Sequence, residues 1–480
     1  MAKINEKDEQ GLKYKKSQCS DWYTEVVQKT ELADYAAIAG CIVFRPYSYA
    51  IWEKIREIFD KMIKETGHEN AYFPLFIPER FLKKEADHFS GFIPEVAFIE
   101  KKEDDSERYA LRPTSETIIY DSYAKWIRSW RDLPLLLNQW CNIVRWEVKA
   151  TRPFLRTREF LWQEGHTVHI SEEEAEKEVT SILSMYVDLI QNYLAIPVLT
   201  GKKTETEKFA GALRTYTLES LMPDGKALQM GTSHNLGQNF AIAFNINFVD
   251  KNMKEKYAWT TSWGISTRLI GALIMMHGDD KGLILPPKIA PIQAVIVPIY
   301  KSKNKKEILK AATKLKKKLG NFSVKIDDRD YCTPGWKFNE WEMKGVPLRI
   351  EIGPKDIKQQ QAILVRRDTG EKEAVKLSII KKIAIMKLEQ IQNNLFKRAK
   401  KFLDSNIYEA TNFKSFEDII KKKKGMAKAK WCGESKCEEE IKDKTGATTR
   451  LIISGKKRVA GKCVHCSKKA KETVYFAKAY

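Results

Sequence analysis

The chain has 480 residues, of which 43% are apolar, so it can bury several hydrophobic cores and is expected to form two to four domains of roughly 150 residues each. This composition excludes a wholly disordered chain, and without any apolar run near the ~20 residues of a bilayer-spanning helix it excludes a membrane-spanning one. The first residues mix acids and bases without an apolar core, so neither a secretory signal nor a transit peptide is expected, and the cytoplasm is the expected compartment.

The net charge of +21 is concentrated toward the end of the sequence. Residues 421–480 contain 18 Lys and Arg against 6 Asp and Glu, a net charge of +12, whereas the other 420 residues carry only +9. A local basic excess of this size indicates a polyanionic partner, nucleic acid ahead of a membrane surface. The alternative is a Lys-rich face that is simply solvated.

The first 80 residues divide into an unpatterned segment and a helix followed by a strand. Residues 1–40 are polar and weakly patterned, and we expect them to lie on the surface. A helix is predicted over 51–66, because apolar side chains recur at helical spacing at Ile51, Ile55, Ile58 and Met62. The strand predicted over 71–77 contains Pro74, which favours an edge or interface position.

The segment that continues to residue 285 predicts strands and helices in irregular order. Ser171 and Glu174 form a capping box for a helix that runs to about Leu194. The other predicted elements are strands at 107–112, 138–147 and 163–170, a helix from near Thr114, two strand-like stretches within 227–249, and a strand-to-helix transition over 263–277. Because the strands return without regular βαβ alternation, we expect an antiparallel or mixed sheet rather than a doubly wound nucleotide-binding fold.

Two further domains are predicted after Leu285. The first is a compact α/β domain with one Lys-rich helix at 306–319. Its strands are predicted at 292–299, 322–326, 347–352 and 362–367. A helix over about 376–403 leads to the last module, and we interpret the Lys421–Lys424 run as a solvated linker near its start. The expected organisation is an α+β protein with domains 1–285, 286–400 and 401–480.

Four of the eight cysteines lie within 35 residues in the last module. They form two knuckles, Cys432-x4-Cys437 and Cys463-x2-Cys466, and four thiolates in this pattern predict a structural zinc ion with no open coordination position. His465 could replace one of the cysteines as a ligand. Four free cysteines are the alternative to metal binding.

Polar residues are dense in several segments of the first domain, and two of these segments are predicted strands. Arg145 and Glu147 would project to one face of their strand, and Trp162, Glu164 and His166 to one face of theirs. Burying such charges unpaired costs several kcal/mol each, so a cleft for a phosphorylated ligand beside a small zwitterion is favoured. An ion-paired structural network is the alternative. The sequence has neither a P-loop nor a Gly-x-Gly-x-x-Gly motif, so a nucleotide would bind on the sheet itself.

These residues resemble the signatures of class II aminoacyl-tRNA synthetases. The helix at 51–66 with its strand resembles the first signature, Arg145-Trp-Glu147 with Phe160 resembles the second, and Gly264 to Arg268 resembles the third. Four runs together resemble prolyl-tRNA synthetases of the archaeal and eukaryotic type, in class IIa: Arg112-Pro-Thr-Ser-Glu116, Phe154 to His166, Gly231-Thr-Ser-His234 and Gly335 to Glu342. The resemblance covers about residues 20–480. It implies an antiparallel class II sheet with flanking helices, an α/β anticodon-binding domain, and a small zinc-binding C-terminal α/β domain.

The resemblance implies that ATP lies bent on the sheet with Mg²⁺ bridging its phosphates. Arg145 and Arg268 are the implied catalytic residues, because Arg145 would contact the α-phosphate, where negative charge builds up, and Arg268 a distal phosphate. Glu147 would accept from the adenine amino group and Phe160 would stack on the base. The implied ATP-binding residues are Arg145, Glu147, Arg156, Thr157, Phe160, Gln229, Thr232 and Arg268.

The amino-acid side of the implied site is suited to L-proline. Thr114 and Glu116 would supply two acceptors for the secondary ammonium group, and aromatic side chains would wall the ring. The implied proline-binding residues are Thr114, Glu116, Arg145, Trp162, Glu164, His166, His234, Ser266 and Phe92. Members of the family usually carry Asp-Tyr after Phe-Ala-Gly-Gly/Ala; here Leu213-Arg214 follows Phe209-Ala-Gly-Ala, which removes an acid near the pocket and adds a base.

The implied anticodon-binding residues are Glu342, Arg349 and Lys355. A carboxylate that faces guanine N1–H and N2–H, with an Arg that faces O6 and N7, is sound base-edge chemistry. A surface ion pair between Glu342 and Arg349 is the alternative. The resemblance also implies that Tyr480 docks toward the active site, with a free end as the alternative.

The implied function is that of a proline–tRNA ligase, which activates L-proline with ATP to prolyl-adenylate and transfers it to the 3′ end of tRNA(Pro). Only about 95 residues separate His166 from Trp263, so we expect no editing domain in cis. The helix over 51–66 and its strand would form a homodimer interface, and no membrane partner is expected. The alternatives are a synthetase-like RNA-binding protein without catalysis and another class IIa specificity, such as threonyl.

Overall fold

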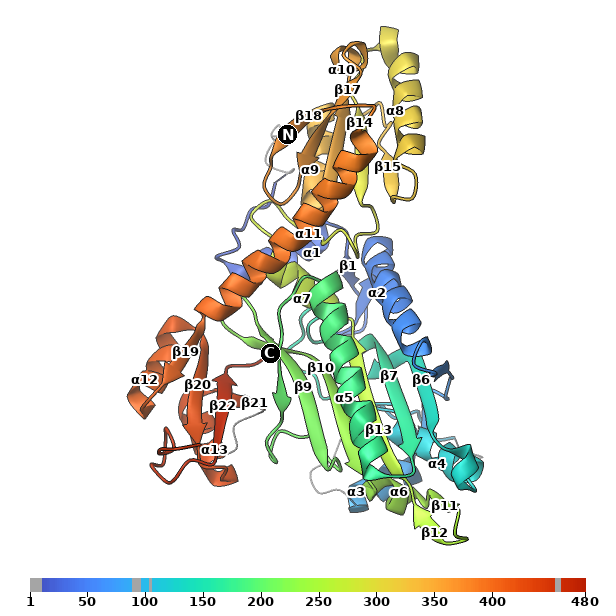
Figure 1. The fold of residues 1–480 in the computed structure, drawn as a ribbon, viewed down its shortest axis with the longest axis vertical. Helices are drawn as coiled ribbons and strands as arrows, with labels where there is room; N and C mark the ends of the chain where they lie inside the picture. The colour runs from blue at the N-terminus through green and yellow to red at the C-terminus, as the bar shows by residue number, and fades with distance from the viewer. Residues whose placement is uncertain (1–10, 89–95, 103–105, 454–458) are drawn as a thin grey trace.

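The computed structural model describes residues 11–88, 96–102, 106–453 and 459–480. Within them, an eleven-stranded sheet and a five-stranded sheet hold most of the strands, and three two-stranded ribbons complete the set. Figure 1 shows the five-stranded sheet at the top, the main part of the long sheet at the bottom, and the C-terminal strands at the lower left. None of the helices in the described segments combines the length and apolar character that crossing a bilayer requires.

Six antiparallel strands form the centre of the long sheet, in the order β8-β9-β10-β13-β7-β6. Their bounds are β6 (Leu135–Val144), β7 (Glu159–His169), β8 (Leu199–Lys202), β9 (Arg214–Leu221), β10 (Ala227–Gly237) and β13 (Trp259–Ser266). Helix α5 (Glu172–Asp188) lies across one face of this sheet (Figure 1). The expected mixed α+β fold with an antiparallel core sheet is therefore confirmed.

The start of α5 forms only part of the expected capping box. Ser171 is the N-cap, and its hydroxyl accepts from the Glu174 N–H at 3.2 Å. The Glu174 carboxylate reaches one residue further back and accepts from the Ile170 N–H at 3.3 Å. The helix still begins at the predicted place because its first turn has a side-chain acceptor.

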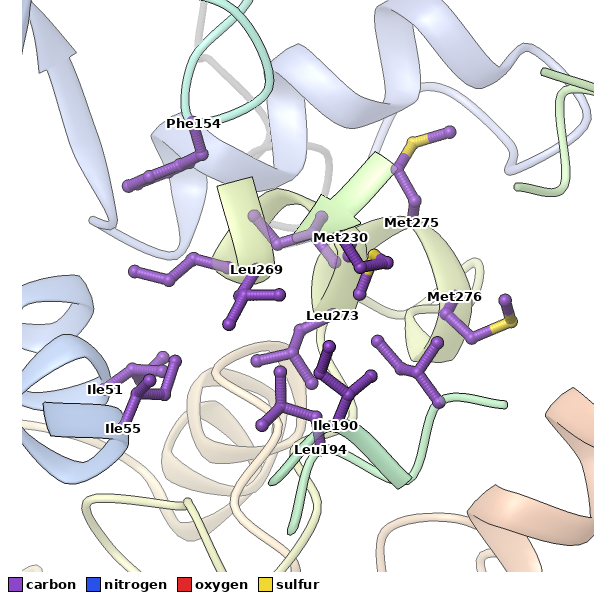
Figure 2. Packing of buried hydrophobic residues seen from close by; sticks show 14 of the residues in the cluster. Ile51, Ile55, Phe154, Ile190, Leu194, Met230, Leu269, Leu273, Met275 and Met276 are labelled. Carbon is purple, nitrogen blue, oxygen red and sulfur yellow. The ribbon is translucent and has the colours of Figure 1, made fainter. Parts of the chain in front are cut away.

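A hydrophobic core packs against one face of the central sheet. It packs α2 (Pro46–Lys64) against α7 (Arg268–His277) and the π-helix η2 (Leu189–Tyr193). Figure 2 shows Ile51 and Ile55 of α2 facing Leu269 and Leu273 of α7. Each fully buried side chain of this size contributes about 1.5–3 kcal/mol relative to exposure, so this contact holds α7 and the arginine at its start in place.

The expectation of a surface segment over residues 1–40 is wrong for 19–29. These residues form α1 (Cys19–Lys29), which buries Trp22, Tyr23, Val26 and Val27 in the core. The Trp22 indole donates to the Asp279 carbonyl at 2.9 Å, and the Tyr23 hydroxyl donates to the Pro153 carbonyl at 2.7 Å. The four buried residues share one helix face, which the polar composition of the segment conceals.

Three other predicted elements differ from the structure. The strand expected over 71–77 is reduced to β4 (Phe76–Pro78), which pairs with β5 (Tyr109–Leu111). The stretch 227–249 contains helix α6 (Asn239–Phe244) between β10 and the short β11 (Asn247–Val249). β6 ends at Val144, so Arg145 and Glu147 lie just beyond the strand rather than on it.

The second part of the chain carries a five-stranded sheet in the order β15-β14-β16-β17-β18. Its strands are β14 (Ala294–Pro298), β15 (Val324–Ile326), β16 (Leu348–Ile352), β17 (Gln361–Arg366) and β18 (Lys372–Lys376). Its helices are α8 (Lys305–Leu319), α9 (Pro334–Met343) and α10 (Pro354–Lys358). Helix α11 (Ile380–Ser405) then runs diagonally from this sheet to the C-terminal part (Figure 1).

The C-terminal part extends the long sheet with four strands in the order β19-β20-β22-β21. Its elements are β19 (Ile407–Ala410), α12 (Phe413–Asp418), η4 (Ile419–Lys423), β20 (Met426–Trp431), α13 (Ser435–Thr445), β21 (Thr448–Ile452) and β22 (Glu472–Ala477). β21 joins β8 of the central sheet through the pair Ile452 and Lys202. The Lys421–Lys424 run is not a linker, since η4 buries Ile419 and Ile420 within this part of the fold.

The remaining described elements are short or peripheral. They are β1 (Ala33–Tyr35), β2 (Ile42–Phe44), β3 (Glu69–Asn70), α3 (Glu79–His88), α4 (Glu116–Trp126), η1 (Trp130–Asp132), β12 (Glu255–Tyr257) and η3 (Ser302–Asn304). Of these, α4 matters most for function, because its first residue is Glu116.

Candidate active site

A cavity of about 270 Å³ opens on the central sheet. Its walls come from β7, β10 and β13, from the start of α4, and from the segment that connects β8 to β9. Twelve residues predicted from the sequence line it together: Thr114, Glu116, Arg145, Phe160, Trp162, Glu164, His166, Gln229, Thr232, His234, Ser266 and Arg268.

Local strand geometry explains how these side chains converge. Trp162, Glu164 and His166 alternate along β7 and therefore share a face. Gln229 and Thr232 are three residues apart on β10, yet both line the cavity, because a β-bulge interrupts the register between Gln229 and Gly231. The sheet thus brings polar residues from three strands to one surface.

Arg145 and Arg268 both line the cavity. Arg145 follows the end of β6, and Arg268 is the first residue of α7. The Arg145 guanidinium lies 5.5 Å from the ring centroid of Phe160 and 5.7 Å from that of Trp162. Arg268 Nε donates to the Leu155 carbonyl at 3.2 Å, and its Nη1 donates to the Gln229 carbonyl at 3.3 Å. Aromatic rings and the Pro113 carbonyl hold Arg145, and two backbone carbonyls hold Arg268, which fixes both side chains before a ligand arrives.

The two guanidinium groups are short of water and close to other positive charges. Burial, and then the charges of Arg145 and Arg156, lower the pKa of Arg268 to about 10. Burial also lowers the pKa of Arg145, although Glu147, Glu116 and Glu164 oppose this effect. Both groups stay protonated at neutral pH, and the site is electrostatically suited to an anion with several charges.

Glu164 and His166 form a buried pair at the base of the cavity. His166 Nε2 lies 3.0 Å from Glu164 Oε2, and Gln139 Nε2 donates to Glu164 Oε1 at 2.8 Å. Burial alone would raise the pKa of the Glu164 carboxyl, but the hydrogen bond and charge of His166 hold it below its usual value. Burial alone would lower the pKa of His166, and the Glu164 carboxylate raises it instead. The Glu164 carboxylate is thus held in a fixed orientation in the cavity by His166 and Gln139.

Thr114 and Glu116 lie beside this pair at the start of α4, and the Thr114 hydroxyl donates to the Glu116 carboxylate. On the opposite wall, His234 Nδ1 is 2.9 Å from the Thr215 hydroxyl. Burial and the charge of His166 lower the pKa of His234 to about 3, so its imidazole is neutral. The pocket therefore combines a carboxylate with neutral rings, a surface that fits a small cation attached to an apolar group.

Three predicted ATP-binding residues do not line the cavity as the others do. Glu147 Oε2 is buried and has no hydrogen-bond partner within the part of the chain that the structure describes, and Arg156 is exposed in the loop between β6 and β7. The Thr157 hydroxyl donates to the Glu159 carbonyl at 2.6 Å. Phe92 lies outside the described residues.

Sequence reasoning missed several cavity residues. The Ser262 hydroxyl is buried and has no hydrogen-bond partner among the described residues, and the alternation Ser262, Gly264, Ser266 along β13 could have identified it. Five more lie on or after the β8–β9 connection, which carries no periodic signal: Lys203, Glu207, Lys208, Phe209 and Thr215. The rest are neighbours of predicted residues on β10 and β13: Met230, Gly231, Trp263, Gly264 and Ile265.

Comparison with known proteins identifies the class of this chain. Three family models match: tRNA synthetase class II core domain (G, H, P, S and T) at residues 98–277, anticodon binding domain at 293–385, and Prolyl-tRNA synthetase, C-terminal at 413–480. A proline–tRNA ligase of Natranaerobius thermophilus is 55% identical over 100% of both chains. The chain belongs to the prolyl-tRNA synthetase family.

Other relatives of this synthetase agree. A proline–tRNA ligase of Alkaliphilus oremlandii is 54% identical over 96% of each chain, and proline–tRNA ligase 2 of Bacillus cereus is 53% identical over 96% of this chain and 97% of its own. The predictions of an aminoacyl-tRNA ligase and of a class II core are confirmed. These relatives are bacterial, and the archaeal and eukaryotic type stays a prediction.

The four cysteines of the C-terminal part of the synthetase come together in space. Their sulfur atoms lie within 4.8 Å of one another, with 3.7 Å between those of Cys437 and Cys463. A tetrahedron with zinc–sulfur bonds of ~2.3 Å has sulfur–sulfur edges of about 3.8 Å, so the donor set fits zinc. His465 Nδ1 lies 3.9 Å from the Cys437 sulfur, but its Nε2 is 3.0 Å from Lys444 Nζ, and it is not part of the cluster.

The predicted anticodon residues lie on α9, β16 and α10 of the anticodon-binding domain of the synthetase. Glu342 does not pair with Arg349: its Oε1 accepts from Lys281 Nζ at 2.9 Å, whereas Arg349 Nη2 donates to Glu351 Oε1 at 2.9 Å. The surface ion pair between Glu342 and Arg349 that was the alternative is therefore absent. Lys355 is exposed at the start of α10.

Tyr480, the last residue of the sequence, lies against the catalytic part of the synthetase. Its hydroxyl donates to Asp224 Oδ2 at 2.6 Å, and its N–H donates to the Ala227 carbonyl at 3.3 Å. Lys226 Nζ lies 5.2 Å from its ring centroid. This residue is docked on the turn between β9 and β10 rather than free.

Proposed function

We propose that this cavity binds ATP and L-proline side by side and joins them as prolyl-adenylate, from which the prolyl group passes to the 3′-terminal ribose of tRNA(Pro). The observation that carries the proposal is one cavity lined by two guanidinium groups, Arg145 and Arg268, together with the Glu116 carboxylate and the rings of Trp162 and His234. The guanidinium groups suit a polyphosphate, and a carboxylate beside rings suits a cyclic imino acid. The relatives that carry the name proline–tRNA ligase match over nearly the full chain, which supports the same specificity.

ATP enters as its magnesium complex and lies along the arginine end. Arg145 contacts the α-phosphate, and Arg268 with Arg156 contacts the distal phosphates. The buried Glu147 oxygen without a partner is the acceptor for the adenine amino group, since an unsatisfied buried carboxylate oxygen is costly until a donor arrives. The remaining nucleotide contacts come from Thr157, Phe160, Gln229 and Thr232.

L-proline lies at the other end of the cavity. Glu116, supported by the Thr114 hydroxyl, accepts from its secondary ammonium group. Trp162 and His234 wall its ring, and Glu164, His166 and Ser266 complete the surroundings. Because the carboxylate of proline is already ionised, it needs no general base to attack the α-phosphorus.

Positioning and charge stabilisation account for the first step. A carboxylate oxygen of proline forms a bond to the α-phosphorus while the bond to the β-phosphate oxygen breaks, and pyrophosphate leaves. Arg145 stabilises the charge that develops on the α-phosphate, and Arg268 that on the leaving pyrophosphate. In the second step a ribose hydroxyl displaces AMP from the prolyl carbonyl.

The test is ATP–pyrophosphate exchange with each of the twenty amino acids. We expect exchange that depends on proline, with alanine as the weaker alternative substrate, because lost methylenes discriminate by only ~1–3 kcal/mol. Exchange that is maximal with threonine would assign another class IIa specificity. An absence of exchange with all twenty would favour a non-catalytic RNA-binding protein.

We also propose that the synthetase has no editing domain in cis, with the architecture of the archaeal and eukaryotic type and domain boundaries near residues 285 and 400. The residues between β7 and β13 form α5, η2, β8 to β10, α6, β11 and β12, which belong to the catalytic fold. The Natranaerobius thermophilus relative aligns over 100% of both chains, which supports the same domain content. Hydrolysis of alanyl-tRNA(Pro) by the purified enzyme would contradict this.

The anticodon proposal assigns Glu342, Arg349 and Lys355 to the guanines of the tRNA(Pro) anticodon. The Arg349 guanidinium lies 4.4 Å from the ring centroid of Phe338, and its Nε and Nη2 donate to Glu351 Oε1 at 3.1 and 2.9 Å, which fixes its direction. We expect Arg349→Lys to raise the KM for tRNA(Pro) at least tenfold in aminoacylation and to leave pyrophosphate exchange unchanged. Loss of exchange in this variant would contradict the assignment.

The cysteine cluster is proposed to hold one structural zinc ion through Cys432, Cys437, Cys463 and Cys466. Elemental analysis of the purified chain should give one zinc per chain. Cys463→Ser should reduce this to near zero, whereas Cys332→Ser, in the anticodon-binding domain, should leave it unchanged. Equal zinc content in the two variants would overturn the assignment.

A homodimer is proposed to form around the first signature. Exposed apolar side chains gather in this stretch of sequence: Tyr35, Ile38, Val43, Tyr49, Tyr72 and Phe76. Exposed apolar side chains that form one patch are typical of an interface. Sedimentation should show a dimer that Tyr72→Asp with Phe76→Asp dissociates; an unchanged dimer would place the interface elsewhere.

A further inference from the structure

The connection between β8 and β9 forms one wall of the cavity and has little regular structure of its own. It contributes Lys203, Glu207, Lys208 and Phe209 to the lining. Residues 203–209 contain no strand or helix. We call these seven residues the wall segment. The Lys203 N–H donates to the Thr215 carbonyl at 2.8 Å and the Lys208 N–H to the Thr204 carbonyl at 2.9 Å, so the backbone holds the start of the segment to β9 and closes a turn within it. Side-chain contacts connect the segment to the rest of the protein.

The first anchor of the wall segment is a carboxylate of the C-terminal domain. Glu438 on α13 is 6% exposed, and its Oε1 accepts from the Thr204 hydroxyl at 3.0 Å. The Thr206 and Thr449 hydroxyls also donate to this carboxylate. A buried carboxylate is costly to leave without hydrogen-bond donors. The Glu438 carboxylate and the threonine hydroxyls of the wall segment therefore stabilise each other's position.

The second anchor is at the start of the wall segment and also involves the C-terminal domain. Lys203 Nζ donates to Glu219 Oε1 at 3.0 Å, and Arg450 of β21 donates to the same oxygen at 2.9 Å. Glu219 is fully buried in β9. Two residues of the C-terminal domain, Glu438 and Arg450, therefore act on the wall segment, one directly and one through Glu219.

The far end of the wall segment reaches the amino-acid side of the cavity. The ring centroid of Phe209 lies 4.8 Å from that of His234, and the Phe209 N–H donates to the Thr215 hydroxyl at 3.0 Å. The Thr215 hydroxyl in turn contacts His234 Nδ1 at 2.9 Å. A displaced wall segment would thus disturb the ring wall at His234 before it reached Arg145 or Arg268.

We propose that Glu438 is a positioning residue for the amino-acid pocket: it holds the wall segment through Thr204 and Thr206, so that the C-terminal domain sets the affinity for the amino acid. This inference rests on the proposed function, which places proline beside His234. Cys437 precedes Glu438 in the first turn of α13 and belongs to the cysteine cluster, so the cluster lies directly beside this anchor. A domain outside the catalytic sheet therefore completes the catalytic site.

The experiment compares Glu438→Ala with Glu439→Ala, an exposed neighbour on the same helix. In pyrophosphate exchange, Glu438→Ala should raise the KM for proline at least fivefold. The KM for ATP and kcat should each change by less than threefold. Glu438→Gln should show a smaller rise, because its amide oxygen still accepts from a threonine. Glu439→Ala should match the wild type.

Hydrogen–deuterium exchange of the full chain gives a readout that does not depend on activity. Peptides that cover 203–209 should exchange faster in Glu438→Ala and not in Glu439→Ala, while peptides from β6 and β7 stay the same. Thr204→Val removes the contact from the other side with little change in volume and should reproduce both effects, so a misfolded Glu438 variant does not decide the matter. Unchanged proline KM and unchanged exchange in Thr204→Val would overturn the proposal. A wild-type enzyme without proline-dependent exchange would instead overturn the proposed function.

Discussion

Arg145 and Arg268 carry positive charge at a depth where water solvates them poorly. Within the described residues neither forms a salt bridge: Arg145 Nε donates to the Pro113 carbonyl, and Arg268 donates to two backbone carbonyls. Backbone oxygens hold the planar groups in place, and the more distant carboxylates Glu147, Glu116 and Glu164 offset part of the charge of Arg145. The remaining charge is then available to a phosphate, and this makes the two arginines more informative about function than an ion-paired arginine on the surface.

The first residue-scale prediction concerns Arg145. Arg145→Lys keeps the charge but removes the planar fork that binds phosphate oxygens in pairs. We expect kcat/KM for proline-dependent pyrophosphate exchange to fall about 10²-fold, in the range seen when one preorganised donor is lost. Arg131→Lys, at an exposed position in η1, should have no measurable effect. Equal activity of the two variants would exclude a transition-state role for Arg145.

A second prediction concerns Glu116 and tests whether the amino acid and ATP occupy different parts of the cavity. Glu116→Gln removes the negative charge that we propose faces the ammonium group of proline. A hydrogen bond to a charged group contributes about 1.5–3 kcal/mol, so the KM for proline should rise roughly 10- to 100-fold while the KM for ATP changes little. Asp121→Asn on the same helix is the matched control. A parallel rise in both KM values would contradict the assignment of Glu116 to the amino acid.

At the scale of elements, the junction between β8 and β21 ties the C-terminal domain to the catalytic sheet. Only one residue pair, Lys202 with Ile452, joins the two strands. Close packing adds to it, since a Cβ at Gly201 would lie 2.4 Å from the Ile452 carbonyl oxygen. The buried group of Lys203, Glu219 and Arg450 lies beside this junction, so the domains are held by charge as well as by backbone pairing.

The prediction for this junction is a loss of stability in Arg450→Met. Breaking a buried ion pair typically costs 3–5 kcal/mol, and because Lys203 still neutralises Glu219, we expect about 3 kcal/mol in urea unfolding. Lys428→Met on β20 breaks an ion pair with the exposed Glu409 and should change stability by less than about 0.5 kcal/mol. If Arg450→Met were as stable as the control, the junction would depend on packing alone.

Across the whole molecule, buried neutral histidines make stability sensitive to acid. Burial lowers the pKa of His169 to about 4, and of His234 and His277 to about 3. Each of them takes up a proton on unfolding at a pH between these values and the unfolded pKa of about 6.5. Above pH 6.5 these histidines are neutral in both states and do not lower the free energy of unfolding. As the pH falls from 6.5 through their folded pKa values, the proton uptake on unfolding lowers it.

We therefore predict that the urea midpoint falls from pH 7 to pH 5. Each neutral histidine costs about 1.4 kcal/mol for every pH unit below 6.5. His277, whose Nε2 donates to the Leu194 carbonyl at 2.8 Å, provides the test. His277→Asn should reduce the pH dependence by up to one proton, measured from urea titrations at pH 7, 6 and 5. An unchanged slope would mean that His277 is not protonated on unfolding.

Much of the catalytic site could be predicted because its residues lie on strands with simple alternation or in contiguous motif runs. Trp162, Glu164 and His166 needed only the period of two along β7. By contrast, the bulge after Gln229 brings Gln229 and Thr232, three residues apart, to the same face of the sheet. The alternation of side chains along a strand does not predict this. Arg145 reached the cavity although it lies beyond its strand, since its N–H donates to the Arg158 carbonyl at 2.7 Å and so continues the pairing of β6 with β7 by one residue.

Sequence alone determined the chemical character of the protein: the arginine, carboxylate and aromatic runs, the cysteine knuckles, and an antiparallel sheet in place of a doubly wound one. These are local properties, set by residue type and spacing within a few turns or strands. The tertiary structure decided that α1 belongs to the core, that Tyr480 docks, and that Glu438 meets Thr204 across 234 residues of sequence. Such contacts depend on how whole domains pack, because burial of a polar pair is favourable only when both partners arrive together, and no pattern within either segment records the other.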